Sequence, residues 1–255
     1  MGNPREILRA YAEKRASVDD VMRVLVEHDG WHVPVHLLST NVADKLIVYA
    51  EQAAVPAETA LVFTDREGAD AFVAKHGGKP LGVYAAPIAG VDLFGALASD
   101  RPECKRIREL RVNEAAPQSE FWFMGAGAFA LSARLARAVV LERAFAAASA
   151  GNVGDLAELM RSFDGWTLPV GKADRSFVRV TLPGGEHVVL FTAGDRAKAL
   201  TQTLPPEQTE KLGFATLTGQ QLFPLLAQAP YAGAIINPNS EPQFVAPAEL
   251  LKLLA

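Results

Sequence analysis

The chain carries one pattern of residues twice, and this duplication constrains its fold more than any other feature. The segment DGWHVPV at 29–35 recurs as DGWTLPV at 164–170. Across the twenty aligned pairs from 17/152 to 36/171, seven residues are identical, the tryptophan among them. Unrelated segments share far fewer residues, so the pattern indicates a tandem duplication.

Three further blocks repeat in the same order. Phe63-Thr64 corresponds to Phe191-Thr192, and GVDLF at 90–94 corresponds to GQQLF at 219–223. A strand that ends at Asn113 corresponds more weakly to one that ends at Asn237. A chain of 255 residues is long enough for one large or two small domains, and the repeat favours two. We expect an N-terminal helix at 1–16, a first module at 17–148 and a second module at 149–255.

Each copy is expected to begin with a capped helix. Ser17 and Asn152 are favourable N-caps, and Asp20 and Asp155 follow three residues later, as a capping box requires. A second helix in each copy is expected to follow the Phe-Thr pair. Its predicted N-caps are Thr64 and Thr192.

The rest of each copy alternates strands with helices. Apolar alternation predicts a strand at 31–36 and 166–171, whose internal proline favours an edge position. Turn residues at 183–185 predict a hairpin. The other elements expected are strands at 45–49, 60–63, 81–85, 177–182, 187–191 and 214–217, and helices at 93–98, 131–149, 222–227 and 247–254. This order predicts an α+β fold of two tandem duplicated modules, with mixed or antiparallel sheets flanked by helices.

These blocks resemble the SseB family, named for enhanced serine sensitivity. The resemblance lies in the opening helix with its Pro-Val strand, the Phe-Thr pair, the Leu-Phe-x-x-Leu helix and the final turn at 237–240. It covers most of residues 17–255, although the first copy carries VNEA at 112–115 where the turn would be. The resemblance implies small cytosolic α+β modules, some described as related to type III secretion, and it implies no catalytic residue.

The most suggestive metal-binding pattern is a histidine spacing. His28, His32 and His36 would share one face of a continuous helix and could ligate a metal there. Asp29-Gly30 and Pro34 interrupt such a helix, and the second copy has no histidine at the equivalent positions. We therefore predict no metal and no cofactor.

Other catalytic patterns also have simpler explanations. The acids present in both copies are explained by a cap and a turn, which leaves no pair for acid–base catalysis. Cys104 has no counterpart in the second copy and is expected to be a free surface thiol. The segment MGAGA at 124–128 lacks the rest of a phosphate-binding motif and is expected to be a tight connection before a helix. The arginines at 105–111 are offset by glutamates, which favours a solvated face.

Aromatic residues are the best candidates for contact with a partner. Trp31 and Trp166 could line a groove, but their repetition favours a role in the core. Three consecutive aromatics on a strand must point to both faces, so at least one should be exposed. The predicted binding residues are Phe121, Trp122 and Phe123 together with the turn residues Asn237, Pro238, Asn239 and Ser240.

Charge and hydropathy limit the classes of partner. The formal net charge of −4 gives no support for nucleic-acid binding, and no apolar run reaches the roughly 20 residues that span a bilayer. The sequence thus predicts a cytoplasmic, non-enzymatic adaptor that binds another protein, with a homodimer left open. The alternatives are an enzyme or small-molecule sensor with a site between the modules, and a factor associated with type III secretion.

Overall fold

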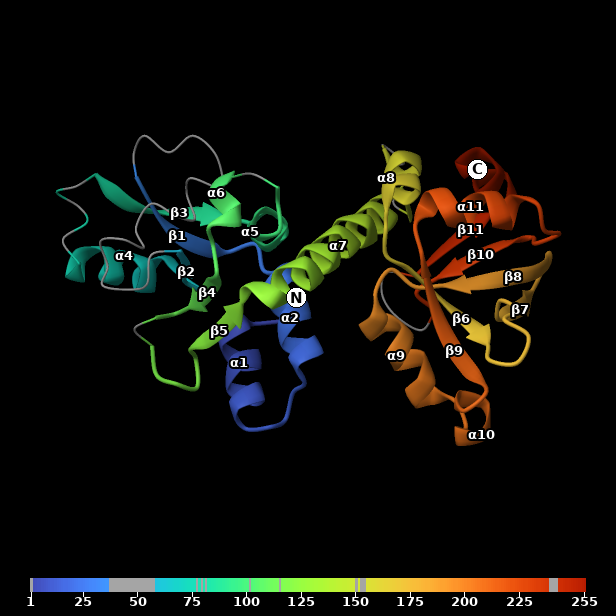
Figure 1. Cartoon of the computed structure of the whole chain (residues 1–255), viewed down its shortest axis with the longest axis horizontal. Helices are drawn as coiled ribbons and strands as arrows, with labels where there is room; N and C mark the ends of the chain where they lie inside the picture. The colour runs from blue at the N-terminus through green and yellow to red at the C-terminus, as the bar shows by residue number, and fades with distance from the viewer. Residues whose placement is uncertain are drawn as a thin grey trace. The chain divides into compact units, whose positions relative to one another are not determined.

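A computed structural model describes all residues except 1, 37–57, 77, 79, 81, 101, 115, 150, 152–154 and 239–242. The chain divides into two compact units, Met1–Arg137 and Ala138–Ala255, which are described separately here (Figure 1). The helix α7 (Phe129–Ser149) contains residues of both units. The expected module boundaries at 16/17 and 148/149 follow from the repeat and stay predictions.

The described part of the first unit is built around five strands. The strand β1 (Trp31–His36) pairs antiparallel with β3 (Val83–Ile88). The strand β4 (Glu109–Val112) pairs parallel with β2 (Thr59–Val62) and antiparallel with β5 (Trp122–Gly125). A bridge between His32 and Phe63 joins these two sheets. The helices are α1 (Pro4–Ala12), α2 (Val18–Glu27), α4 (Arg66–Lys75), α5 (Gly90–Leu97) and α6 (Pro102–Lys105), with a 3-10 turn η2 (Ala126–Ala128) before α7.

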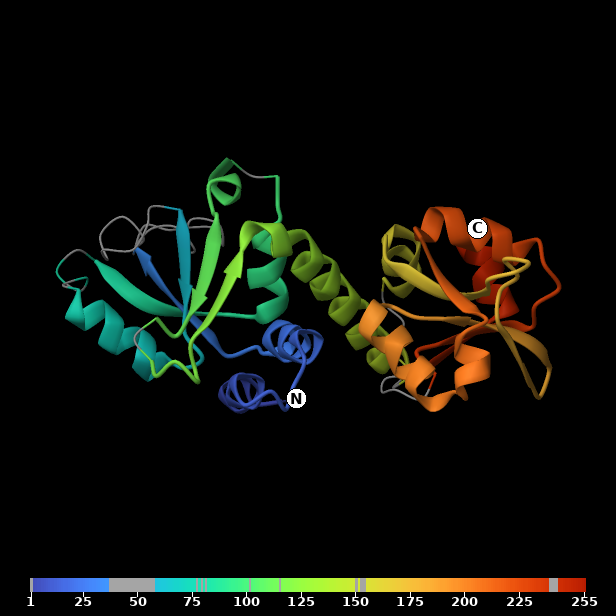
Figure 2. The ribbon, with the colours of Figure 1, turned by 60° about the horizontal axis from the view of Figure 1, so that its bottom comes forward.

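The second unit repeats this topology. The strand β6 (Trp166–Gly171) pairs with β9 (Leu212–Leu217), and Thr167 bridges to Phe191. A four-stranded sheet places β10 (Gly233–Ile236) parallel to β8 (Gly185–Leu190), with β11 (Phe244–Pro247) and β7 (Arg179–Leu182) at its edges. The helices are α8 (Leu156–Ser162), α9 (Gly194–Thr203), α10 (Pro206–Thr209), α11 (Gly219–Ala227) and α12 (Ala248–Leu254). Helices flank mixed sheets in each unit, which confirms the α+β fold (Figures 1 and 2).

The repeated tryptophans belong to the cores. Trp31 and Trp166 have no exposed surface, and each indole N–H donates a hydrogen bond to the last turns of the preceding helix. The acceptors are the carbonyl oxygens of Leu25, at 2.9 Å, and Met160, at 3.1 Å. A buried indole is stabilised when its N–H has such a partner. The prediction that these residues are core is confirmed, and no groove is lined by them.

Several predicted elements lie where the sequence placed them. Ser17 caps α2, and its capping box with Asp20 is complete. The hairpin of β7 and β8 turns at 183–184, and α5 and α11 contain the Leu-Phe segments. The segment at 124–128 forms the end of β5 and the turn before α7, as expected. The strand predicted at 45–49 and the cap at Asn152 lie outside the described residues.

Two predictions about element ends are wrong. Asp155 is not the third residue of a capped helix, because α8 starts at Leu156. The helix after each Phe-Thr pair begins one residue later than predicted, so the N-caps are Asp65 and Ala193. The strand β1 pairs with β3 on one side and, among the described residues, has only the His32–Phe63 bridge on the other side, to which Pro34 also points. Alternate residues direct their backbone groups to opposite sides, so Pro34 withholds no hydrogen bond from β3.

Candidate functional site

A buried polar network connects four residues of the second unit. The Thr192 N–H donates to the Asn237 Oδ1 atom over 3.1 Å, and the Thr192 hydroxyl donates to the carboxylate of Glu142 in α7. The second oxygen of Glu142 accepts from Arg196 over 3.0 Å. Thr192 and Asn237 have no exposed surface, and Glu142 is 4% exposed. This network holds α7, α9 and the end of β10 together.

The first unit contains the same network with the charges exchanged. The Thr64 N–H donates to Asn113 Oδ1 over 3.0 Å. The helix α1, which precedes the repeat, supplies an arginine, and the Nε atom of this arginine donates to Thr64 Oγ1 over 3.1 Å. This residue, Arg5 of α1, also pairs with Asp65 and with Glu120. Arg9 forms a second ion pair with Glu120. The threonine hydroxyl of the second unit thus contacts an acid, Glu142 of α7, whereas that of the first unit contacts an arginine, Arg5 of α1.

The two networks explain the repeated Phe-Thr and Asn residues. Asn113 and Asn237 have positive φ values of 56° and 53°, a conformation that asparagine tolerates better than most residues. Because Thr64 and Thr192 take part in these networks, the capping role predicted for them is wrong. The contact role predicted for Asn237 is also wrong, because a residue with no exposed surface cannot touch a partner. Pro238 is half-buried, and Asn239 and Ser240 lie outside the described residues.

The aromatic segment lies at the edge of the first unit's sheet. Within the described residues, β5 pairs only with β4. Phe123 is 50% exposed and lies opposite Arg111, whereas Phe121 and Trp122 are half-buried. The Ala126 N–H donates to the Arg108 carbonyl, so the antiparallel alternation directs the N–H and C=O of Phe123 away from β4. An exposed aromatic ring therefore lies beside free main-chain donors and acceptors.

The ion pairs of Glu120 fix the start of this strand. Glu120 is 8% exposed and accepts hydrogen bonds from Arg9, while its main-chain carbonyl accepts from Asn113 Nδ2 over 3.1 Å. The hydrogen bond to Glu120 and the negative charge of Glu120 raise the pKa of the Arg9 guanidinium above its ordinary value. Because the residue before Phe121 is held at both its side chain and its carbonyl, the aromatic edge is presented by a rigid support.

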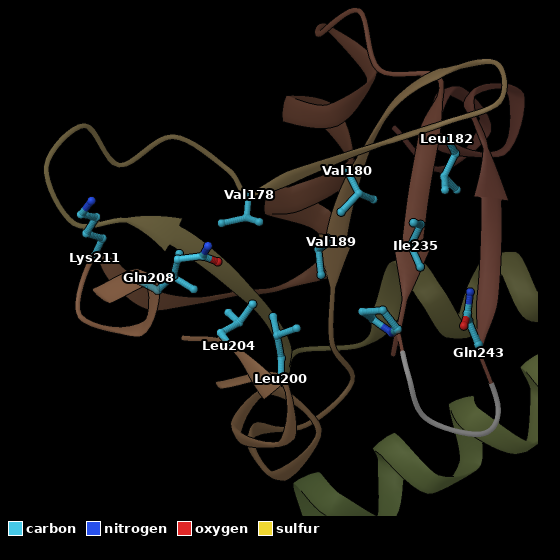
Figure 3. Close-up of a pocket in the computed structure, with 12 residues that line it drawn as sticks. Val178, Val180, Leu182, Val189, Leu200, Leu204, Gln208, Lys211, Ile235 and Gln243 are labelled. Atoms are coloured by element: carbon cyan, nitrogen blue, oxygen red, sulfur yellow. The ribbon is translucent and has the colours of Figure 1, made fainter. Parts of the chain in front are cut away.

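A cavity of about 570 Å³ opens in the second unit (Figure 3). One wall is the outer face of β7, β8 and β10, and the other is formed by α9, α10 and the start of β9. Lys211 and Gln208 lie toward one end, and Leu182 and Gln243 toward the other (Figure 3). Lys211 carries the single charge among the twelve lining residues, which are Val178, Val180, Leu182, Val189, Leu200, Leu204, Gln208, Lys211, Leu212, Ile235, Pro238 and Gln243.

No motif in the sequence predicts this cavity, although the apolar pattern along β7 is a signal for it. Val178, Val180 and Leu182 alternate along β7, and Val180 and Leu182 are each 36% exposed. An alternating apolar strand indicates a covered face, but α9 and α10 cover only part of this one. How far two short helices extend over a sheet depends on tertiary packing, which the strand's own sequence does not encode.

The remaining candidates have structural roles. Cys104 is 1% exposed, so the prediction of a surface thiol is wrong. His28 ends α2 and its ring meets Trp31 edge to face, as Phe163 meets Trp166 in the second unit. Arg111 pairs with Glu109 and Glu114, but the three side chains are only about a fifth exposed, so the fully solvated face expected there is not found at these residues.

Within the ranges given above, no cluster of three or more histidine, cysteine, aspartate or glutamate side chains could hold a metal ion. No helix among those residues has the length and apolarity to cross a bilayer.

Comparison with known proteins assigns no family. No protein-family model matches the chain, and no curated protein matches it. Among solved structures, Tic22 of Anabaena, described as a protein of protein transport, is similar at 11% identity and a TM-score of 0.24. The match covers 84% of this chain and 88% of that one. A likeness this weak assigns neither a fold nor a function.

Proposed function

We propose that this chain is a non-enzymatic adaptor of the SseB type, which binds an extended segment of a partner protein along β5. The observation that supports the proposal is the exposed aromatic edge: Phe123 lies beside main-chain groups that β4 leaves free. Extended peptides add to such edges through main-chain hydrogen bonds, and neighbouring side chains select the sequence. Natural proteins usually protect an edge that they do not use.

The buried polar networks favour an adaptor over an enzyme. Thr192 and Glu142 resemble a nucleophile and a base, because the hydroxyl donates directly to the carboxylate. Neither group reaches solvent, and a substrate would have to displace Asn237 to approach them. The threonine–asparagine part of this network repeats in the first unit around Thr64, where an arginine takes the place of the acid, and this repetition indicates a role in supporting the fold.

Two substitutions of Phe123 test the proposal. Phe123→Ala removes the exposed ring, and Phe123→Pro removes the outward N–H while leaving the bonds to β4 intact. Proteins captured from native lysate by the wild-type chain should be lost with both variants. Tyr84→Ala is the matched control, because Tyr84 is 42% exposed on β3 of the same unit.

The partner is then identified, and its affinity is measured by calorimetry with each purified variant. A loss of tenfold or more with Phe123→Ala, and none with Tyr84→Ala, supports binding along β5. If a partner binds wild type and both Phe123 variants equally, the proposed surface is wrong.

A further inference from the structure

The apolar and polar residues that line the cavity of the second unit are separated, and this separation selects the kind of ligand that fits. Its walls are branched aliphatic side chains, and its polar groups lie toward the ends (Figure 3). No set of polar groups converges at its centre to orient a sugar, a base or a peptide group. A ligand that fits these walls has an apolar body and carries its polar group at one end.

One end of the cavity carries its single cationic side chain. Lys211 lines it, and its ammonium forms no ion pair with any described residue. The neighbouring Lys172 does not line the cavity: its N–H donates to the Lys211 carbonyl over 2.9 Å, and its Nζ donates to the Glu210 carbonyl. The nearby Asp174 is occupied by hydrogen bonds from Ser176 and does not line the cavity. An anionic group is complementary to this end.

One residue that lines the cavity differs in size from its counterpart in the first unit. The helix α9 follows Thr192 as α4 follows Thr64, so Leu200 corresponds to Phe72. Phe72 is 3% exposed, and its ring packs against Phe63 at 5.3 Å between centroids. Leu200 is smaller and lines the open cavity instead. The second unit therefore carries a smaller side chain at this wall of the cavity than the first unit carries at the equivalent position.

We propose that this cavity binds a free straight-chain aliphatic monocarboxylate, with its chain along the aliphatic walls and its carboxylate at Lys211. A volume of about 570 Å³ is within the usual range for small-molecule sites. A lone ammonium suits a monovalent carboxylate better than a phosphate, which usually recruits an arginine fork or several main-chain N–H groups. This site is independent of the proposed β5 surface, which belongs to the other unit.

Chain length and head-group charge test the proposal separately. Octanoate, decanoate and dodecanoate are titrated into the full chain by calorimetry below their micelle concentrations. The dissociation constant should fall about fourfold for each added methylene, with one site per chain. Lys211→Gln should weaken dodecanoate about fivefold or more and leave 1-dodecanol unchanged. Lys75→Gln, which alters an exposed lysine of α4, is the matched control.

Filling the cavity gives an independent readout. Leu200→Phe restores the residue type that the first unit has at this position and should abolish dodecanoate binding. Leu225→Phe is its control, because Leu225 is a 50% exposed leucine on α11 of the same unit. Circular dichroism and the unfolding midpoint verify that each variant is folded.

Three results would overturn the assignment. The first is the absence of dodecanoate binding to the wild-type chain. The second is binding that neither Lys211→Gln nor Leu200→Phe weakens. The third is displacement of a bound fluorescent apolar probe by an apolar peptide but not by dodecanoate, which would assign the cavity to a protein partner.

Discussion

Close approach of helices explains why two glycines recur at equivalent positions. A Cβ atom added to Gly90 would lie 2.4 Å from the Val26 carbonyl oxygen, and one added to Gly219 would lie 2.4 Å from that of Met160. The main-chain N–H of each glycine also donates over 2.7 Å to the residue that ends the opposing helix. The alignment of the copies detected the glycine, but the reason for it is a contact between segments distant in sequence.

Substitution of Gly90 should therefore be far more costly than substitution of a glycine one turn away. We expect Gly90→Ala to lower the free energy of unfolding by about 1–3 kcal/mol, because the opposing backbone must move. Gly95→Ala in the same helix meets nothing within 4 Å and should be neutral or stabilising by about 0.5–1 kcal/mol. Urea unfolding followed by circular dichroism measures both. Equal effects of the two substitutions would contradict this account.

Helix starts are the elements whose chemistry the sequence shows most directly, because a cap involves residues three apart. Ser17 with Asp20 and Thr218 with Gln221 both form complete capping boxes. The first is charged and the second is neutral. The pKa of Asp20 is lowered, first by the hydrogen bond from the Ser17 hydroxyl and then by that from the Ser17 N–H.

This difference predicts a pH-dependent contribution from only one of the two boxes. The folded-state pKa of Asp20 lies below its unfolded value of about 3.9, so the stabilisation is complete above about pH 5 and is lost as the pH falls through the folded pKa. Ser17→Ala should cost about 1 kcal/mol at pH 7 and less at pH 3. Thr218→Ala should cost about the same at both pH values, because Gln221 does not titrate. A Ser17→Ala effect that is equal at both pH values would refute this.

Element ends that depend on distant residues could not be derived in this way. Thr64 satisfies the sequence pattern of a cap, yet its hydroxyl accepts from Arg5 of α1 and Asp65 caps α4 instead. Asp65 has a lowered pKa: its partial burial raises it, but the Gly68 N–H and the Arg5 guanidinium outweigh that effect. A three-residue motif does not show which of two adjacent polar residues a distant arginine engages.

At the scale of the whole molecule, α7 belongs to two cores. Its residues from Ala138 onward pack in the second unit, where Leu141 and Phe145 are 1% and 0% exposed among the side chains of α8, α11 and α12. Glu142 closes the polar network there. The sequence pattern places α7 at the end of the first copy. Its second half, however, contacts the threonine of the second unit's polar network, as α1 contacts the threonine of the first unit's network.

Two fragments test this assignment. The fragment 138–255 should fold and unfold cooperatively, whereas 149–255 should not, because it lacks Leu141, Glu142 and Phe145. Loss of a single buried phenylalanine side chain costs about 3–5 kcal/mol, a large part of the stability of a small domain. Nuclear magnetic resonance dispersion and urea unfolding distinguish the outcomes. A stably folded 149–255 fragment would contradict the role given to α7.

The sequence by itself determined the duplication, the α+β class, the order of most described elements and the burial of Trp31 and Trp166. Those conclusions depend on periodicity, caps and repetition, which are local or can be compared along the chain. Tertiary structure alone decided that Asn237 is buried, that Cys104 is covered, that Phe123 is the exposed one of the three aromatics at 121–123 and that a cavity lies beside Leu200. Each of these depends on which distant segments cover a residue, and packing between segments leaves no local pattern in the sequence.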